Sequence, residues 1–336
     1  MNSTFETSSS ETSLPDTVAS EISAPSNASL SSTYSKAFQA AREAVGPQNH
    51  PTSTLYVVAT PIGNLADITL RALYVIERAD TLACEDTRHT QQLLRAYGLD
   101  RSSTQLLAVH QHNETEAAAQ VIQRLAKGER VAYVSDAGTP AISDPGARLV
   151  ASVAAAGFRV MPLPGASSVT TLLSAAGVMG DSGFVFTGFL SSKASDRQRA
   201  IETLSGESRA VVLLEAPHRI EALAQALACL GSRRITVGRE LTKQFETVHT
   251  TQAQTLPAWF SEKPERVRGE FALVIHALEK SKAALVEALD ADSLRILKLL
   301  LTELPLKTAV KLTSDITGAS KNTVYDTALA LKKGQD

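Results

Sequence analysis

Small, polar and turn-forming residues follow five short apolar runs in the first half of the chain. The segments are TPIGN (60–64), EDTR (85–88), HQHNE (110–114), SDAGTP (135–140) with DPG (144–146), and PLPGASS (162–168). Gly138 and Gly165 leave bare backbone that a flat ligand can approach closely. Glu85, Asp86 and Arg88 could do acid–base chemistry, or could form an ion pair at a helix N-terminus. Together the segments favour one ligand pocket over five independent turns.

Several of these residues also have simpler roles. Cys84 lies in an apolar run and is expected to be a small buried hydrophobe. His110, His112 and Glu114 could suggest a metal site, but no further ligands cluster near them in the sequence. We therefore expect them to cap a helix or to form hydrogen bonds, and we expect no metal.

The five apolar runs must be strands if their ends are to meet. They are LYVVAT, TLACED, QLLAVH, VAYVSD and RVMPLP, and the helical candidates between them are Asp67–Arg78, Thr87–Tyr97, Glu114–Lys127 and Ala147–Ala156. Alternating strands and helices predict a parallel sheet covered on both faces. In such an open α/β sheet, ligands bind at the carboxyl ends of the strands, where the polar segments lie.

The second half of the chain predicts another α/β domain. Its apolar runs are FVFTGFL, AVVLLEA, RITVGREL, ETVHTT and FALVIHAL, and the close spacing of the last ones suggests antiparallel pairing in a mixed sheet. Three glycines near Gly177–Gly183 suggest the boundary, and Pro305 and Gly318 separate three short C-terminal helices. The expected organisation is a tail (1–50), an N-terminal α/β domain (51–178), a second α/β domain (179–285) and a helix-turn-helix-like segment (290–336).

Residues 1–35 contain 12 Ser and 5 Thr. Such a composition has too little apolar surface to offset the entropy of ordering, so we expect a disordered tail over residues 1–50. We also expect that removing residues 1–45 leaves folding intact.

Composition narrows the function further. The net charge of −2 indicates no global attraction to nucleic acid, and two distant cysteines suit a reducing cytoplasm. No apolar stretch approaches the ~20 residues of a membrane span. The dinucleotide fingerprint G-x-G-x-x-G, the phosphate loop, H-E-x-x-H and G-x-S-x-G are all missing.

Nine segments in order resemble one family. They are TPIGNLADITLRA, CEDTRHTQQLL, HNE, SDAGTPAISDPG, PLPGASS, GFLSSK, EAPHR, RELTKQFE and RGE. They are similar to the bacterial small-subunit ribosomal RNA methyltransferase I family, in the tetrapyrrole-methylase superfamily, over about residues 55–333. Ala166 and Ser191 stand where the family often has proline, which changes no functional group.

The resemblance implies S-adenosylmethionine bound between two α/β domains, a homodimer, and methylation of the ribose 2′-oxygen of a decoding-centre cytidine in 16S rRNA of the small ribosomal subunit. Glu85 and Asp86 become candidates for the base or for orienting the ribose, and Arg88, in the same catalytic set, becomes a candidate for a phosphate contact. The candidate cofactor residues are Pro61, Asp136, Ala137, Gly138, Thr139, Gly165, Ala166 and Ser167. The candidate RNA contacts are Lys193, Arg239, Lys243, Lys307, Lys311 and Lys321.

Two other functions stay open at this stage. A porphyrin or corrin C-methyltransferase would need an apolar trough for its macrocycle, whereas these loops are polar. A non-catalytic RNA-binding assembly factor would not need to bind S-adenosylmethionine. Cofactor binding and methyl transfer to small subunits distinguish the three functions.

Overall fold

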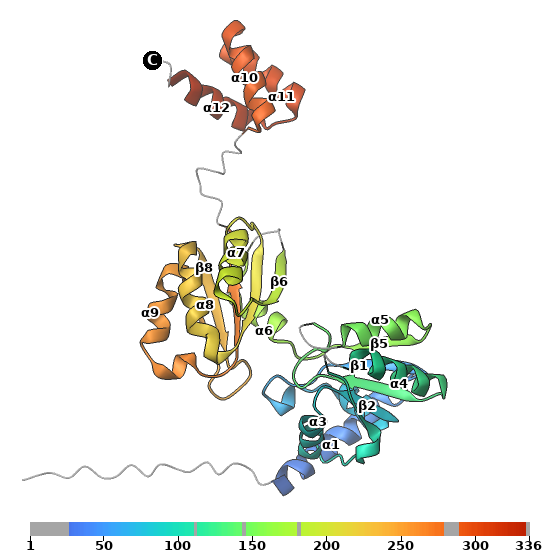
Figure 1. Cartoon of the computed structure of the whole chain (residues 1–336). Coiled ribbons are helices and arrows are strands. Elements are labelled where there is room, and N and C mark those ends of the chain that lie inside the picture. The colour runs from blue at the N-terminus through green and yellow to red at the C-terminus, as the bar shows by residue number, and fades with distance from the viewer. Residues whose placement is uncertain (1–26, 111–112, 143–145, 180–182, 279–288, 334–336) are drawn as a thin grey trace, which may run out of the picture. The chain divides into compact units, whose positions relative to one another are not determined.

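The computed structural model of the chain describes residues 27–110, 113–142, 146–179, 183–278 and 289–333 (Figure 1). The chain divides into two compact units, Met1–Ser167 and Ser168–Asp336. Each unit contains one five-stranded sheet. None of the helices in these described parts combines the length and the apolar character that crossing a lipid bilayer demands.

The first unit contains a wholly parallel sheet in the order β3-β2-β4-β1-β5, which confirms the predicted class. Its strands are β1 (Thr54–Val58), β2 (Thr81–Cys84), β3 (Leu106–Ala108), β4 (Arg130–Val134) and β5 (Arg159–Leu163). Its helices are α1 (Asn27–Val45), α2 (Leu70–Arg78), α3 (Thr87–Ala96), α4 (Glu114–Ala126) and α5 (Ala147–Ala155), with 3-10 turns at Leu65–Asp67 and Ser103–Gln105.

Helices cover both faces of this sheet because successive strand side chains point to opposite sides. In β1, Leu55 packs with α4 and α5 in one core cluster, whereas Tyr56 and Val58 pack with α1 and α2 in another. All three side chains are buried. Burial on both faces explains why these strands are continuous apolar runs in the sequence.

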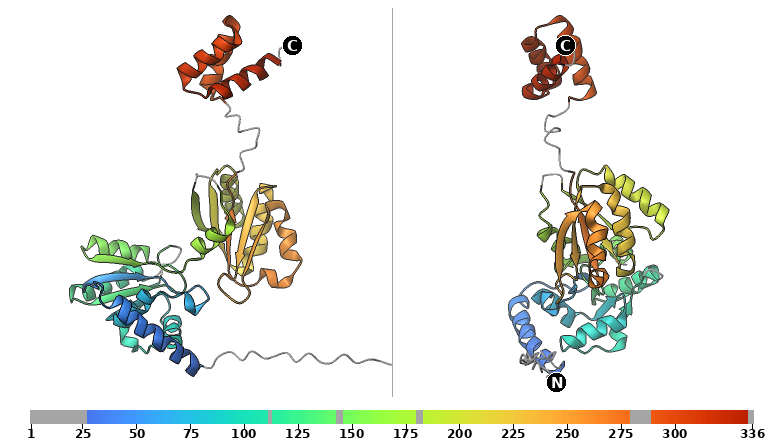
Figure 2. Two further views of the ribbon diagram at one scale, coloured as in Figure 1. Left: turned by 180° about the vertical axis from the view of Figure 1, so that it is seen from behind. Right: turned by 90° about the vertical axis from the view of Figure 1, so that its left-hand side faces the viewer.

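The helix α1 corrects the expected tail. Residues 1–26 lie outside the described residues, but Asn27–Val45 form a helix, so the predicted disordered segment 1–50 is wrong over this stretch. Phe38, Ala41 and Val45 are buried against α2, α3 and the sheet, and Arg42 pairs with Glu77 of α2. The blue α1 runs along the first unit in both views of Figure 2.

The second unit contains a mixed sheet in the order β6-β7-β10-β8-β9. Its strands are β6 (Phe184–Phe189), β7 (Ala210–Glu215), β8 (Arg234–Arg239), β9 (Thr247–Gln252) and β10 (Phe271–Ile275). Its helices include α6 (Ser168–Ala176), α7 (Ala194–Ser205), α8 (Ile220–Leu227) and α9 (Leu256–Ser261), with 3-10 turns at Pro217–Arg219, Ala228–Leu230, Ala253–Thr255 and Pro264–Val267. Strand β10 pairs antiparallel with β7 and β8, and β8 with β9, as the close spacing suggested.

Helix α6 belongs to the second unit, so the units divide before it and not at Gly177–Gly183. The helix packs against β9 and β10, and its Leu172 is fully buried. Packing against strands distant in the sequence places α6 in the second unit. The glycines that follow mark only the end of the helix.

Three helices close the chain: α10 (Ala291–Glu303), α11 (Leu306–Thr317) and α12 (Lys321–Lys333). Asp290 caps α10 through the amide of Ser293, and Gly318 ends α11 in a left-handed conformation, with a φ of +73°. Leu297, Val310 and Val324 form their shared core. The predicted C-terminal helical segment is confirmed.

Candidate functional site

In the first unit, the loops after β1 and β4 form one structure. The backbone N–H of Thr60 donates to the carbonyl of Gly138 at 2.9 Å, and that of Gly138 donates back to Thr60 at 3.0 Å. The Thr60 hydroxyl donates to the carbonyl of Ser135 at 3.1 Å. Because every one of these groups is buried, the bonds fix the two loops against each other.

The loop after β5 joins this pair. The Thr139 hydroxyl donates to the carbonyl of Ala166 at 3.0 Å. A side chain on Gly165 would lie 2.7 Å from the Cβ of Ala59, and one on Gly138 would lie 3.2 Å from Ile62. Gly138 also has a φ of +83°, which favours glycine. The loops after β1, β4 and β5 therefore meet only because these positions lack side chains.

The candidate cofactor residues differ in exposure. Pro61 and Gly138 are buried and support the loops from beneath. The residues that reach the surface, wholly or in part, are Asp136, Ala137, Thr139, Gly165, Ala166 and Ser167. The surface at this sheet edge therefore consists of small side chains, exposed backbone and one carboxylate. Such a surface suits a ligand that carries a positive charge and is recognised by backbone groups of the protein.

The loop after β2 brings Asp86 to the same edge, where it meets Asp136 of the loop after β4. The backbone N–H of Asp86 donates to the Asp136 carboxylate at 3.3 Å. The Asp86 carboxylate caps α3, since it accepts from the Arg88 amide at 2.8 Å, and it pairs with the Arg88 guanidinium at 2.9 Å. Hydrogen bonds from the side chain and the amide of Arg88 lower the pKa of Asp86 to about 2. Asp86 is therefore a weak base that holds a helix end, and Glu85 beside it is half-buried.

A pH dependence of stability follows from this cap. Because the folded pKa lies below the ordinary value, Asp86 stabilises the protein above about pH 4, and the contribution is lost as the pH falls toward 2. Urea unfolding from pH 2 to 6 measures it. We expect Asp86→Ser, which keeps a cap but does not titrate, to flatten the acid side of the profile. An unchanged profile would show that the carboxylate is not the titrating cap.

The other candidates near this edge have structural roles. Burial raises the pKa of the Cys84 thiol to about 11, as a buried small hydrophobe requires. The Glu114 carboxylate accepts from the Gly146 amide at 2.5 Å. The amide of His110 donates to the Asn113 side chain at 2.8 Å, and His112 lies outside the described residues. Among the residues described, no three His, Cys, Asp or Glu side chains gather as metal ligands.

In the second unit, the loop after β8 is a network of charged groups. The Lys243 ammonium donates to Glu240 and to Glu270, each at 3.0 Å. Arg239 donates to the carbonyls of Arg268 at 2.8 Å and of Phe245 at 3.1 Å. Both cations were expected to contact RNA. The structure shows that their donors also hold the protein's own loop, and their contact with RNA stays a prediction.

Comparisons with known proteins show to which family the chain belongs. Residues 54–257 match the family model of tetrapyrrole (corrin/porphyrin) methylases. The chain belongs to this methylase family. Residues 287–332 match the RsmI C-terminal HTH domain, which covers α10, α11 and α12. The helix-turn-helix-like segment expected from the sequence is thus a recognised domain.

Relatives with curated names align with most of the sequence of this methylase. It is 45% identical over 277 residues to "Ribosomal RNA small subunit methyltransferase I" of Escherichia coli O157:H7, covering 82% of this chain and 94% of that protein. The protein of the same name from Pseudomonas aeruginosa is 44% identical, with 82% and 96% covered. Among solved structures, diphthine synthase matches with a TM-score of 0.50 at 14% identity, covering 66% of this chain and 90% of that chain. The methyltransferase CobJ matches with a TM-score of 0.50 at 15% identity, covering 67% and 94%. These structures share the fold.

The remaining lysine candidates of the methylase are exposed. Lys193 lies at the start of α7 and faces Asp196 at 3.9 Å. Lys307 and Lys311 lie one turn apart on α11, and Lys321 begins α12. Exposed lysines on a helical domain suit phosphate contacts, which position a nucleic acid without reading its sequence.

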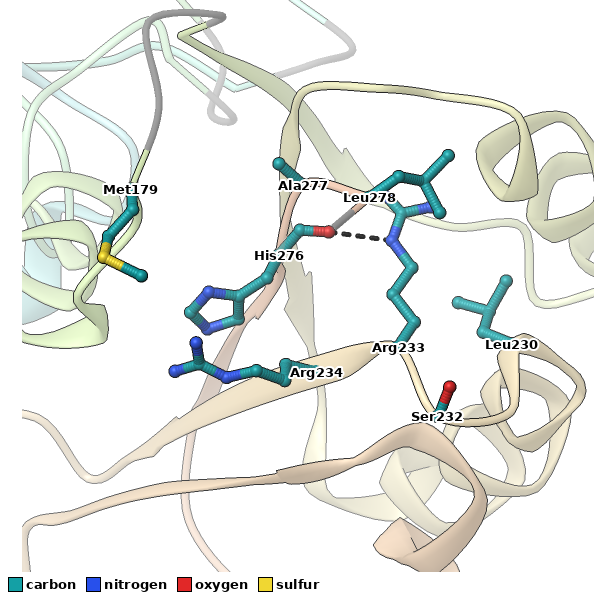
Figure 3. Close-up of a pocket in the computed structure, with 8 residues that line it drawn as sticks. All are labelled: Met179, Leu230, Ser232, Arg233, Arg234, His276, Ala277 and Leu278. Atoms are coloured by element: carbon teal, nitrogen blue, oxygen red, sulfur yellow. Dashed lines mark hydrogen bonds between the residues drawn. The ribbon is translucent and has the colours of Figure 1, made fainter. Parts of the chain in front are cut away.

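A pocket of about 280 Å³ lies in the second unit, and none of the candidate site residues lines it (Figure 3). It is lined by Met179, Leu230, Ser232, Arg233, Arg234, His276, Ala277 and Leu278. Arg233 is buried and donates to the His276 carbonyl at 2.7 Å and to carbonyls of the segment 204–209. Arg233, which lines the pocket, is therefore a structural residue. No local pattern announces it, because its acceptors are 24 to 43 residues away in the sequence.

We expect Arg233→Ala to lower the free energy of unfolding by about 3 kcal/mol, because several buried carbonyls lose their donor. Urea unfolding followed by circular dichroism measures the loss. Arg234→Ala at the neighbouring, half-buried position is the matched control, with an expected loss below about 1 kcal/mol. Equal losses in the two variants would contradict the role assigned to Arg233.

Proposed function

We propose that this methylase transfers a methyl group from S-adenosylmethionine to the ribose 2′-oxygen of a decoding-centre cytidine in 16S rRNA. The observation that carries the proposal is the 45% identity to "Ribosomal RNA small subunit methyltransferase I" over 94% of that protein's length. The alignment covers 82% of this chain, and the family models match residues 54–257 and the C-terminal helical domain at 287–332.

The joined loops of the first unit fit S-adenosylmethionine. The residues proposed to hold it are the surface set around Ala137, Gly165 and Ala166, with Pro61 and Gly138 beneath. Small side chains and exposed backbone suit the nucleoside, and the half-buried Asp136 carboxylate complements a positive charge. When bound, the cofactor supplies a methyl group on a sulfonium with its own leaving group, so the protein needs no covalent nucleophile.

The protein must then align the ribose hydroxyl and help to remove its proton. Alignment can contribute roughly 7–11 kcal/mol, and a positioned base typically adds ~10²–10⁴-fold. We assign the base to Glu85, because Asp86 is occupied in capping α3 and has a pKa of about 2. Arg88 stays with Asp86 as its ion-pair partner.

A comparison of two neutral isosteres tests this assignment. We expect Glu85→Gln to lower kcat for methyl transfer by ~10²-fold or more, since the base is lost. Asp86→Asn should change kcat by less than ~10-fold, because the amide oxygen can still cap α3. Single-turnover transfer from radiolabelled S-adenosylmethionine measures both. The reverse order of effects would return the role of base to Asp86.

The partner of the proposed reaction is the 16S rRNA of the small ribosomal subunit. Lys193, Lys307, Lys311 and Lys321 are proposed to contact its phosphates, because they are exposed. A homodimer and a cytoplasmic location belong to the same proposal. They accord with the family resemblance and with two cysteines that form no disulfide.

Mass spectrometry of modified nucleosides tests the function directly. Small subunits lacking the modification are incubated with the protein and S-adenosylmethionine, and 2′-O-methylcytidine is measured after digestion of the 16S rRNA. The proposed function predicts one new 2′-O-methylcytidine. Methylation of uroporphyrinogen III alone would favour a tetrapyrrole enzyme, and absence of cofactor binding would favour an assembly factor.

A further inference from the structure

The loop between β8 and β9 carries an aromatic side chain that the proposed chemistry does not use. Phe245 is 68% exposed, although phenylalanine is usually buried. The neighbouring Gln244 and Glu246 are exposed and polar. The ring therefore stands between polar residues and is flanked by no apolar neighbour in the sequence.

The loop holds this ring in a defined place. Arg239 donates to the Phe245 carbonyl at 3.1 Å, and the Thr242 amide donates to the Glu246 carboxylate at 2.6 Å. Lys243 ties the loop to Glu270 of the adjoining segment, as described above. Glu240 and Thr242 have φ values of +51° and +68°, which residues other than glycine rarely adopt. Such strain persists only where the surroundings impose it, and it concentrates at binding sites.

An exposed cation lies on a second segment that is tied to the backbone of Phe245. The same Arg239 guanidinium that donates to the Phe245 carbonyl also donates to the Arg268 carbonyl at 2.8 Å, so one side chain ties the two backbone segments together. The Arg268 side chain is exposed, and it has no ion pair with any residue that the structure describes. Two backbone segments tied together by Arg239 thus carry an exposed aromatic ring, on Phe245, and an exposed guanidinium, on Arg268.

We propose that Phe245 stacks on an unpaired base of the RNA substrate and that Arg268 contacts a phosphate of the same strand. The inference rests on the proposed function, because it takes the substrate to be RNA. Single-stranded RNA is recognised by aromatic rings that stack on splayed bases and by cations along the backbone. An isolated ring with polar neighbours fits one flat base better than it fits a second protein surface, whose core would be an extended apolar patch.

Binding of a fluorescein-labelled oligocytidylate, followed by anisotropy on the full chain, tests the pair. We expect Phe245→Ala to weaken binding by roughly 5- to 150-fold and Phe245→Trp to restore it. Arg268→Ala should reduce the slope of log affinity against log salt by ~0.7. Phe184→Ala, at another exposed ring of the same unit (49%), is the matched control and should leave binding unchanged.

The outcomes separate this inference from the proposed function. If the protein without substitutions does not methylate small-subunit RNA, the proposed function fails. The oligocytidylate titration still tests the stacking in that case. If methylation proceeds but Phe245→Ala binds oligocytidylate as tightly as Phe184→Ala, the stacking role is wrong. A loss of dimer mass by light scattering in Phe245→Ala, with RNA affinity unchanged, would assign the ring to a contact between copies and would also overturn the inference.

Discussion

The Gly138→Val variant is expected to lose ~100-fold or more in affinity for S-adenosylmethionine, measured by isothermal titration calorimetry. Valine disfavours the φ of +83° at this position, and its Cβ would lie 3.2 Å from Ile62 in the joined loops. The Thr60–Gly138 bridge must then shift, and displacement of a site by about 1 Å can cost ~100-fold. The loss of affinity should exceed the loss of stability, because the change lies at the edge of the sheet.

A matched glycine separates the loop geometry from the backbone strain. Gly157 has the same φ of +83°, but a side chain there would meet no atom within 4 Å. We expect Gly157→Val to show the strain as reduced stability while it keeps the affinity for S-adenosylmethionine. If both variants bind the cofactor equally well and are folded by circular dichroism, the cofactor site lies elsewhere.

Removal of residues 1–45 is expected to cost the first unit about 5 kcal/mol of folding free energy. The deletion removes the buried Phe38 and Val45 and uncovers Leu73, Tyr74 and Tyr97, against which α1 packs. Fully burying a large apolar side chain contributes about 1.5–3 kcal/mol, so the loss approaches the whole stability of a marginal domain. Urea unfolding of the truncated protein should show an early transition that the full chain lacks.

Two smaller changes make this test specific. Deletion of residues 1–26 should leave the unfolding curve unchanged, because this Ser- and Thr-rich segment has few large apolar side chains. Phe38→Ala in the full chain should lower the free energy of unfolding by about 3 kcal/mol, the usual cost of truncating a buried phenylalanine. A deletion of 1–45 that unfolds like the full chain would restore the dispensable tail expected from composition.

Local patterns in the sequence were sufficient for the fold class. Buried strands such as β1 and β4 are continuous apolar runs, and Asp86 is recognisable at a helix N-terminus, because these signals involve neighbours within a few residues. The polar segments after the strands likewise marked the candidate site, since parallel strands bring their carboxyl ends to one edge. The disorder predicted from composition was wrong at α1, because a helix rich in Ser and Ala can still bury one face through Phe38.

What each polar side chain does was decided by tertiary structure. Asp86 reads equally well as a base or as a cap, and only its bonds to Arg88 distinguish the two. The sequence shows Lys243 as a surface cation, but folding brings Glu270 to it from 27 residues away. Thr60 and Gly138 meet across 78 positions because β1 and β4 are sheet neighbours. Such partners depend on which strands pair, and strand pairing is fixed by the packing of the whole unit, which no local stretch of sequence encodes.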